Sequence, residues 1–351
     1  MIGSEKAWGG GGLSSHDFLF EKIIAPENVF GAWREFQKGK MKKMDVLEFA
    51  QNAEENLFGL INDLKLGRYQ HSQYSRFVVC DPKRREIAKA SVRDRVLHHA
   101  IHRVIVSLFE PSFIFDSYSS RKEKGIHLAG KRLDSFALKL SRNHTKTVWV
   151  LQADVKKFFD SVNHEILSVF LEKKIKNEEG MELLKIIINS FEALENRGIP
   201  LGNLTSQLFS NVYLDAMDQF VKRELQAKYY IRYADDIVIL SLDRDFLENC
   251  LQRISVFVEE ELKIKIHPQK ISLKKWHQGI DFLGYVRFPF YSVMRTKTKQ
   301  RMFHKIKKKK ADCEIGNISE NSLQQSLQSY CGVLKHCRGY KIKNKLNSID
   351  R

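Results

Sequence analysis

Apolar residues recur at intervals of three and four along the first part of the chain, which is the spacing of an amphipathic helix. One such stripe covers residues 46–64, and a second covers residues 96–108. Between them, residues 75–91 contain two short β-like runs separated by Asp81 and Pro82, which favour a turn. We therefore expect helices on either side of a β-hairpin.

The middle of the chain is richer in strand patterns. β-like runs occupy residues 147–155 and 281–288, and residues 229–240 have two β-like halves on either side of two adjacent acids. The latter arrangement predicts a tight hairpin with acids at its tip. Helical patterns separate these runs, at residues 183–191, 208–221 and 246–262. This order predicts an α+β chain with a helix-rich, a mixed and a second helical region, which need not be independent domains.

The charge of the chain changes this picture, because the 351 residues carry a formal net charge of +17. A basic protein of this size most often binds nucleic acid. Residues 295–351 hold 15 Lys and Arg against four Asp and Glu, so this segment is a distinct basic module. Its run HKIKKKK (304–310) is typical of a solvated helix face, and the apolar residues that follow predict a small helical bundle with one basic side.

Membrane and disulfide-rich classes are disfavoured. The longest uncharged run, residues 198–214, contains too many polar side chains to span a membrane, and the N-terminus lacks the pattern of a signal peptide. Residues 1–15, which include GGGGLSS, are expected to form a flexible leader. The five cysteines are scattered and odd in number, which suits reduced thiols in the cytoplasm, and none has the spacing of a zinc knuckle.

Three acids lie at expected strand ends. Asp154 follows the apolar run 148–153, and Asp235 and Asp236 lie at the tip of the predicted hairpin. A single acid at such a tip is most often a plain turn former. Three in a basic chain have the arrangement that holds two divalent cations for in-line displacement at phosphorus. Oxygen ligands of this kind suit Mg²⁺, with Mn²⁺ as an alternative ion.

The string YADD, preceded by LQADVKKFFDSVNHEIL, strongly resembles the palm of reverse transcriptases. GIPLGNLTSQLFSNVYL (198–214) resembles the base-pair loop and helix of that family. DFLGY (281–285) resembles its primer-grip hairpin, and HPQK (267–270) resembles the lysine-bearing segment before that hairpin. Three segments resemble the finger elements of the group II intron-like lineage, namely PKRREI (82–87), SVRDRVLHHAI (91–101) and SYSSRKEKGIHLA (117–129). The matching segments span roughly residues 45–290 and follow one another in the order seen in the family, so a chance resemblance is improbable.

The resemblance implies a right-hand polymerase fold with helical and β-hairpin fingers, an antiparallel-sheet palm and a short basic helical thumb. The boundaries that it implies are a leader at 1–15, N-terminal helices and fingers at 16–146, a palm at 147–290 and a thumb at 291–351. A finger insertion is expected within the palm, near residues 165–197.

The same resemblance implies roles for the three acids. Asp154, Asp235 and the backbone carbonyl of Val155 would ligate two Mg²⁺ ions, with Asp236 as a nearby supporting acid in the catalytic set. One ion would lower the pKa of the primer 3′-hydroxyl, and the other would neutralise the triphosphate and the pyrophosphate.

Nucleotide-binding roles follow in the same way. Phe159 matches the aromatic gate under the incoming sugar; the alternative is a core aromatic, a role that we expect of Phe158, which points the other way on a strand. Lys83 and Arg85 would clamp the triphosphate, unless they are simply solvated at the hairpin. Lys270 resembles the lysine proposed to protonate pyrophosphate, and a plain surface lysine is the alternative.

Nucleic-acid contacts are expected in three places. Arg121 would contact either a template phosphate or an internal acid, and the sequence does not choose between them. The primer grip and the basic run supply the remaining candidates, which are Phe282, Leu283, Gly284, Lys307, Lys308, Lys309 and Lys310.

The base-pair loop indicates which reverse transcriptase this is. Intron and retroviral enzymes typically read Q-G-x-x-x-S-P there, whereas this chain has Leu201 before Gly202 and Gln207 after Ser206. These departures, and the segment SYCGVLKHCRGYKIKNKL (329–346), resemble reverse transcriptases of diversity-generating retroelements. Leu201, Gly202 and Gln207 are accordingly expected to lie against the incoming nucleotide. The 66 residues after Tyr285 leave room for a thumb, which argues against a retroviral or full intron-encoded enzyme.

The resemblance implies an RNA-directed DNA polymerase that copies a template-repeat RNA into cDNA with errors opposite adenine, for targeted gene diversification. Its implied partners are structured template RNA, the cDNA or primer, and a small basic accessory protein, the accessory variability determinant; a cytoplasmic, bacterial or phage-encoded protein is expected. Two alternatives remain, a retron or phage-defence reverse transcriptase and a non-catalytic RNA-binding scaffold. The loop disfavours the first, and the intact acids disfavour the second.

Overall fold

The structure, a computed structural model, describes residues 18–80 and 84–350, with the backbone alone for 347–350. The chain divides into two compact units. The first comprises Met1–Ile114, Lys156–Asp218 and Phe257–Lys265, and the second comprises Phe115–Val155, Gln219–Val256 and Ile266–Arg351. The predicted leader lies outside the described residues, and the predicted domain boundaries stay a prediction.

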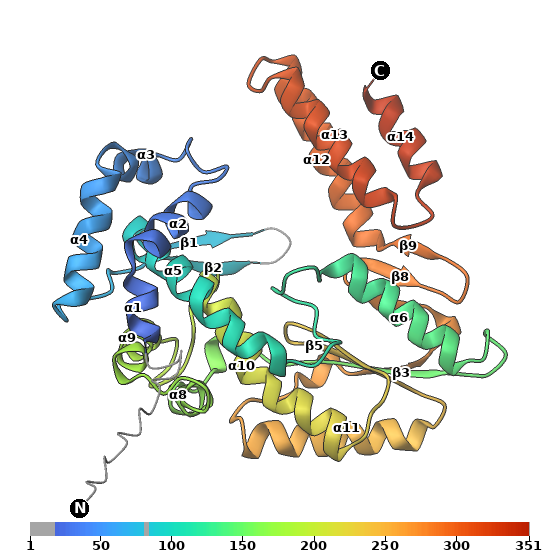
Figure 1. Cartoon of the computed structure of the whole chain (residues 1–351). Coiled ribbons are helices and arrows are strands. Elements are labelled where there is room, and N and C mark those ends of the chain that lie inside the picture. The colour runs from blue at the N-terminus through green and yellow to red at the C-terminus, as the bar shows by residue number, and fades with distance from the viewer. Residues whose placement is uncertain (1–17, 81–83, 351) are drawn as a thin grey trace, which may run out of the picture. The chain divides into compact units, whose positions relative to one another are not determined.

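The first unit is mainly helical (Figure 1). Its helices are α1 (Leu19–Ile24), α2 (Pro26–Phe36), α3 (Met44–Gln51), α4 (Ala53–Lys65), α5 (Val92–Phe109), α7 (Phe158–Ser161), α8 (His164–Glu172), α9 (Glu178–Asn189) and most of α10 (Leu204–Gln219). Helix α5 confirms the helix predicted over 96–108, and α2 packs along it. The stripe over 46–64 is two helices, because the backbone of Asn52, with φ −123° and ψ 40°, leaves the helical region.

The predicted hairpin of the first unit is present. Strands β1 (Ser75–Val79) and β2 (Arg85–Lys89) pair antiparallel, with Ser75 opposite Lys89 and Val79 opposite Arg85. The expected turn at Asp81 and Pro82 lies outside the described residues. All of β1 is exposed, and Figure 1 shows the two strands extending away from the helices of their own unit.

The second unit is built on a four-stranded antiparallel sheet in the order β4-β5-β3-β6. Its strands are β3 (Trp149–Asp154), β4 (Tyr230–Tyr233), β5 (Asp236–Ser241) and β6 (Ser272–Lys275). Valines and leucines on one face of β3 and β5, such as Val150, Val238 and Leu240, pack on Leu133 and Phe136 of α6 (Ile126–Leu140). Alternating side chains therefore bury one face of the sheet under this helix. Helix α11 (Arg244–Glu260) follows β5.

A second, three-stranded sheet leads into the C-terminal helices. It consists of β7 (Ile280–Phe282), β8 (Tyr285–Arg287) and β9 (Ser292–Met294), so the run predicted over 281–288 is a hairpin. Helices α12 (Thr296–Glu314), α13 (Glu320–Leu334) and α14 (Tyr340–Asp350) follow, coloured orange to red in Figure 1. Met302, Ile306, Leu323, Leu327 and Leu346 form their core, which confirms the predicted bundle. In the part of the chain that the structure describes, no helix has the length and apolar character needed to cross a membrane.

A buried arginine attaches the β7–β8 hairpin to α6. Arg287, which is 4% exposed, donates through Nη1 to Asp134 Oδ2 of that helix at 2.5 Å. The guanidinium lies against Gly130, where an added Cβ would come within 1.8 Å of Arg287 Nη2. Glycine at position 130 thus provides the room that the arginine occupies.

We predict that Gly130→Ala destabilises the protein by about 1–3 kcal/mol, the usual cost of forcing extra volume into a packed site. Gly59→Ala is the matched control, because it lies in α4 and a Cβ there meets no described atom within 4 Å. Alanine has the higher helix propensity, so the control should gain up to about 1 kcal/mol. Urea unfolding of both variants measures this, and equal stability of Gly130→Ala and wild type would contradict the account.

Candidate active site

Strand pairing brings the three acids of the second unit to one end of its sheet. Asp154 is the last residue of β3 and lies opposite Asp236, the first residue of β5. Asp235 occupies the turn between β4 and β5 together with Ala234, whose φ of +52° closes the turn. The backbone N–H of Val155 donates to the Asp235 carbonyl at 3.3 Å, which fixes the turn against the end of β3.

These carboxyl groups repel one another. Asp154 is only 6% exposed. Burial and then the charge of Asp154 raise the pKa of Asp235 to about 6. The side chain of Asp236 is exposed but lines a concave site, and desolvation there, followed by the charges of Asp235 and Asp154, raises its pKa above the ordinary value. The Lys270 ammonium forms an ion pair with Asp154 Oδ2 and offsets part of the negative charge.

A fully buried arginine that was not predicted from the sequence forms a hydrogen bond to the backbone of this turn. Arg232 of β4 donates through Nη1 to the Ala234 carbonyl at 3.2 Å. Its backbone N–H donates to the Asp116 carbonyl at 3.0 Å, and its own carbonyl accepts from Tyr118 N at 2.9 Å. The available signal was an arginine within the apolar run YYIRY, since a buried guanidinium must find acceptors.

A pocket of about 320 Å³ adjoins the acids within the second unit. Asp154 and Asp236 line it together with the β7–β8 hairpin, where Leu283 and Gly284 form the turn with φ of +51° and +89°. The side chain of Phe282 is 3% exposed and packs in the core, so the hairpin presents mainly the turn itself.

Polar residues that were not among the predicted site residues complete this pocket. Arg295 Nε donates to Asp281 Oδ1 at 2.6 Å, and Gln152 Nε2 donates to the Asp281 carbonyl at 3.0 Å. The Gln152 contact holds the hairpin beside β3, and the Arg295 contact joins the hairpin to the start of α12. Arg121, left open from the sequence, donates through Nη1 to the Ser117 carbonyl at 3.0 Å.

The basic run of the second unit lies on α12. Lys307 and Lys308 are exposed, whereas Lys309 and Lys310 are half-buried. Lys309 Nζ donates to Ser326 Oγ of α13 at 2.6 Å. The predicted solvated face is therefore present, with Lys309 also connecting the two helices.

The first unit contains the remaining candidates. Phe158 is 2% exposed and packs on Tyr213, while Phe159 is half-buried. The expectation that they alternate along a strand is wrong: both lie in the helical turn α7, because Lys157 adopts a left-handed conformation at φ 46° and ψ 47°. The carbonyl of Phe159 accepts from Ile199 N at 2.8 Å, which connects α7 to the loop before α10.

That loop lies against the β1–β2 hairpin. A Cβ on Gly202, whose φ is +111°, would approach Ile87 Cγ2 of β2 at 3.6 Å. Leu201 is half-buried, and Gln207 is exposed on the first turn of α10. Arg85 begins β2 and is exposed, whereas Lys83 lies outside the described residues. The contact between Gly202 and Ile87, which lies two residues after Arg85, thus brings the loop and β2 together within the first unit.

The fold and the acids at the sheet edge define a polymerase-like palm, and the comparisons agree. A telomerase from Candida tropicalis, in complex with a TWJ fragment of telomeric RNA, superposes with a TM-score of 0.51 at 12% identity, over 83% of this chain and 58% of that one. Protein YkfC of Escherichia coli is 25% identical over an alignment 268 positions long, which covers 64% of this chain and 69% of YkfC.

The family follows from the sequence. The family model described as "Reverse transcriptase (RNA-dependent DNA polymerase)" matches residues 80–286. The group II intron-encoded protein LtrA of Lactococcus lactis subsp. cremoris is 22% identical over an alignment 344 positions long, which covers 76% of this chain but 56% of LtrA. The chain belongs to the reverse transcriptase family, which confirms the predicted right-hand polymerase fold and the prediction of an RNA-directed DNA polymerase.

The raised pKa of Asp235 predicts a pH-dependent cost in stability. Between about pH 4 and 6 the unfolded chain releases this proton while the folded chain retains it, so stability falls as the pH rises through that window. In the presence of a chelator, Asp235→Asn should therefore be more stable than wild type by about 1–2 kcal/mol at pH 7.5, and close to equal at pH 4.

Urea unfolding at the two pH values measures the difference. Asp160→Asn, which changes an exposed carboxylate of α7, is the control and should show no such change with pH. A destabilised Asp235→Asn at pH 7.5 would contradict the crowding of the three acids.

Proposed function

We propose that this chain synthesises DNA on an RNA template at the edge formed by Asp154, Asp235 and Asp236. The observation that carries the proposal is the β3–β5 register, which puts Asp154 opposite Asp236 beside a pocket of about 320 Å³. Membership of the reverse transcriptase family supports the same reaction.

The donor set of this edge fits divalent metal. Three carboxyl groups with a single lysine partner leave an excess of negative charge that a cation would relieve. No set of three or more His, Cys, Asp or Glu within the described residues is arranged to bind a metal unaided. Mg²⁺ needs only one or two protein carboxylates when water and substrate phosphates complete its shell. Asp154, Asp235 and the Val155 carbonyl would hold two Mg²⁺ or Mn²⁺ ions, and bound ions of this kind would lower the pKa of the 3′-hydroxyl and neutralise the phosphates.

The chain's own side chains would position the reactants. The pocket next to the acids would hold the primer end, with the Leu283–Gly284 turn against its backbone. Arg85 would bind the triphosphate, and Phe159 would fill the space of a ribose 2′-hydroxyl. Lys270, which forms an ion pair with Asp154, would supply a proton to the leaving pyrophosphate.

Asp235→Asn should abolish primer extension, because the charge that holds the metal is lost. Its affinity for RNA should remain that of wild type, since the exposed lysines of α12 are unchanged. Extension of a DNA primer on an RNA template with Mg²⁺ measures the first, and filter binding measures the second. Asp245→Asn, in the first turn of α11, is the control that keeps activity. Robust extension by Asp235→Asn would refute the assignment.

We further propose that the template is a template-repeat RNA and that errors concentrate opposite adenine, for diversification of a target gene. The support is the loop in which Leu201 and Gln207 stand where intron and retroviral reverse transcriptases typically have Gln and Pro. Leu201 cannot make the polar contact that Gln would offer a nucleotide. Loss of a contact worth about 1–3 kcal/mol lowers discrimination by roughly one to two decades. The preference for adenine itself comes from the resemblance.

The same proposal extends to partners. Structured template RNA would bind the basic face of α12, where Lys307 and Lys308 are exposed, through phosphate contacts that salt weakens. A small basic accessory protein, the accessory variability determinant, would act with this complex.

Leu201→Gln should lower misincorporation opposite template A more than opposite U, C or G, by about tenfold if the restored contact contributes about 1.4 kcal/mol. Sequencing of cDNA made on one RNA with native accessory protein and flanking RNA measures this. Leu194→Gln, an exposed leucine of the first unit, is the matched control. Equal wild-type error rates at all four template bases would leave an ordinary reverse transcriptase.

A further inference from the structure

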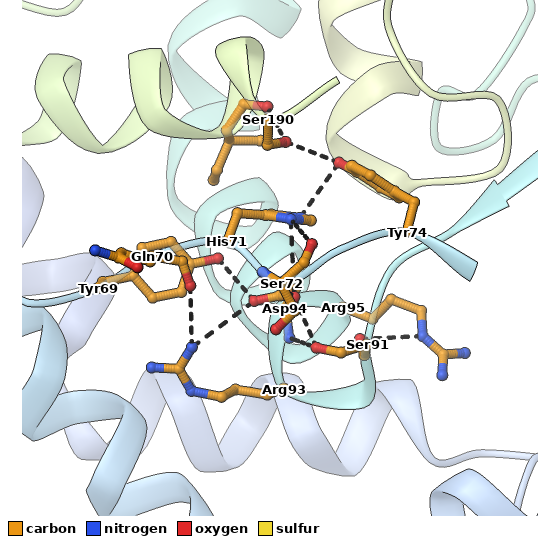
Figure 2. Close-up of polar contacts among 11 residues, drawn as sticks. Tyr69, Gln70, His71, Ser72, Tyr74, Ser91, Arg93, Asp94, Arg95 and Ser190 are labelled. Atoms are coloured by element: carbon orange, nitrogen blue, oxygen red, sulfur yellow. Dashed lines mark hydrogen bonds and ion pairs between the residues drawn. The ribbon is translucent and has the colours of Figure 1, made fainter. Parts of the chain in front are cut away.

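A buried carboxylate lies at the start of α5 in the first unit, far along the chain from the three acids of the sheet edge. Asp94 is 0% exposed. Its Oδ1 accepts from Tyr69 Oη at 2.9 Å, and its Oδ2 accepts from Ser91 Oγ at 2.7 Å and from Ser72 N at 3.1 Å. Ser91 also caps α5 by accepting from Asp94 N at 3.1 Å. Figure 2 shows these donors converging on the one carboxylate.

The donors come from both ends of the β1–β2 hairpin. Tyr69 and Ser72 lie on the segment that enters β1 at Ser75, and Ser91 lies just after β2 ends at Lys89. One side chain therefore holds the entering and leaving segments at the end of α5. Asp94 acts as a clamp at the base of the hairpin.

The residues of the two strands are little buried, so packing of the strands themselves does little to fix the hairpin. Among the residues of the two strands, all of which the structure describes, Ala88 is the only buried one. Two further contacts support the base: Tyr74 Oη lies 2.9 Å from Ser190 Oγ, and Lys89 Nζ lies 2.7 Å from Asp45 Oδ2. Away from the base, Arg76 of β1 lies over the Phe191 ring at 5.5 Å and Ile87 of β2 lies beside Gly202. The buried hydrogen bonds that orient the exposed strands are those at the base.

The chemistry of the clamp requires an ionised acid. Burial alone would raise the pKa of Asp94, but the hydrogen bond from Ser91, the nearby His71 and the hydrogen bonds from Tyr69 and Ser72 lower it below its ordinary value. His71 Nδ1 lies 3.8 Å from Oδ2, and its ring stacks on Tyr74. Asparagine offers one acceptor oxygen where the carboxylate offers two, so Asp94→Asn leaves donors of the clamp unpaired.

We infer that Asp94 is a positioning residue for nucleotide binding, which holds the β1–β2 hairpin so that Arg85 is presented to the incoming triphosphate. This inference rests on the proposed polymerase function for its substrate, because Arg85 is the group through which Asp94 acts. Asp94 itself touches neither substrate nor the reacting atoms.

The test compares Asp94→Asn with Asp63→Asn in the full chain. Asp63 of α4 pairs with Arg93 of α5 at 2.8 Å and bonds to neither end of the hairpin. Arg93 also lies 3.9 Å from Asp94 Oδ1 and donates to the Gln70 carbonyl at 3.4 Å, and Asp63→Asn leaves both of these partners in place, so it controls for loss of one salt bridge at α5. Asp94→Asn should raise the KM for dNTP about tenfold with kcat within about twofold, since a misplacement of about 1 Å can cost up to roughly 100-fold. Tyr69→Phe removes one donor, keeps the ring, and should give a smaller rise.

Two readouts separate positioning from general destabilisation. Amide hydrogen exchange of residues 75–79 and 84–89 should accelerate in Asp94→Asn and not in Asp63→Asn, while that of α5 residues 97–109 stays as in wild type. Arg85→Ala should raise the KM for dNTP, and Asp94→Asn should add nothing to it in the double variant, because the two act on one contact. Additive effects, or an unchanged KM together with unchanged exchange, would overturn the inference.

Failure of the proposed function is distinguishable from failure of this inference. A wild-type chain without polymerase activity would refute the former, and the exchange arm would still decide whether Asp94 holds the hairpin. If Asp94→Asn does not fold, Tyr69→Phe carries both readouts, and a Tyr69→Phe variant identical to wild type in KM and exchange would refute the clamp.

Discussion

The antiparallel register between β3 and β5 is the constraint on which the candidate site depends. Val150 opposite Leu240 and Leu151 opposite Ile239 form the core pairs, and the same ladder ends with Asp154 opposite Asp236. Side chains alternate along a strand, so a slip by one residue would turn every core side chain to the other face. The hydrophobic pairing that stabilises the sheet therefore also fixes the positions of the acids.

Holding the three acids close together costs folding free energy, and interactions of the surrounding residues offset part of this cost. Desolvation and mutual repulsion raise the pKa of Asp235, and Lys270 neutralises only part of this charge. The buried Arg232 binds the carbonyl of Ala234, whose left-handed backbone closes the turn. Local strain and charge at a site that a buried network supports are typical of functional sites. In the first unit, Asp94 has a comparable role at the base of an otherwise exposed hairpin.

Local patterns in the sequence predicted much of this architecture. The apolar period predicted α5, the apolar run over 148–153 predicted β3, and the acids between two β-like halves predicted the β4–β5 hairpin, because each signal depends on neighbouring residues. The break at Asn52 and the helical turn at Phe158 were not predicted, since single backbone conformations there override the period.

Local sequence patterns could not predict contacts between residues that are distant in the sequence. Arg287 against Gly130 and the Asp94 clamp each join segments whose proximity the fold alone creates. The residues of the candidate site show the same contrast. The three acids were predicted from the motifs and the expected strand ends, whereas Arg232 and the Asp281–Arg295 pair were identified only from their contacts in the structure.

Metal-directed cleavage of the protein tests the central claim most directly, namely that strand pairing builds a divalent-metal site at one sheet edge. Fe²⁺ substituted for Mg²⁺, with ascorbate and peroxide, generates radicals that cut the backbone beside the bound ion. The account predicts cuts near residues 153–156 and 234–237, which excess Mg²⁺ suppresses. Cuts confined to other segments, or cuts at these positions that Mg²⁺ does not suppress, would contradict it.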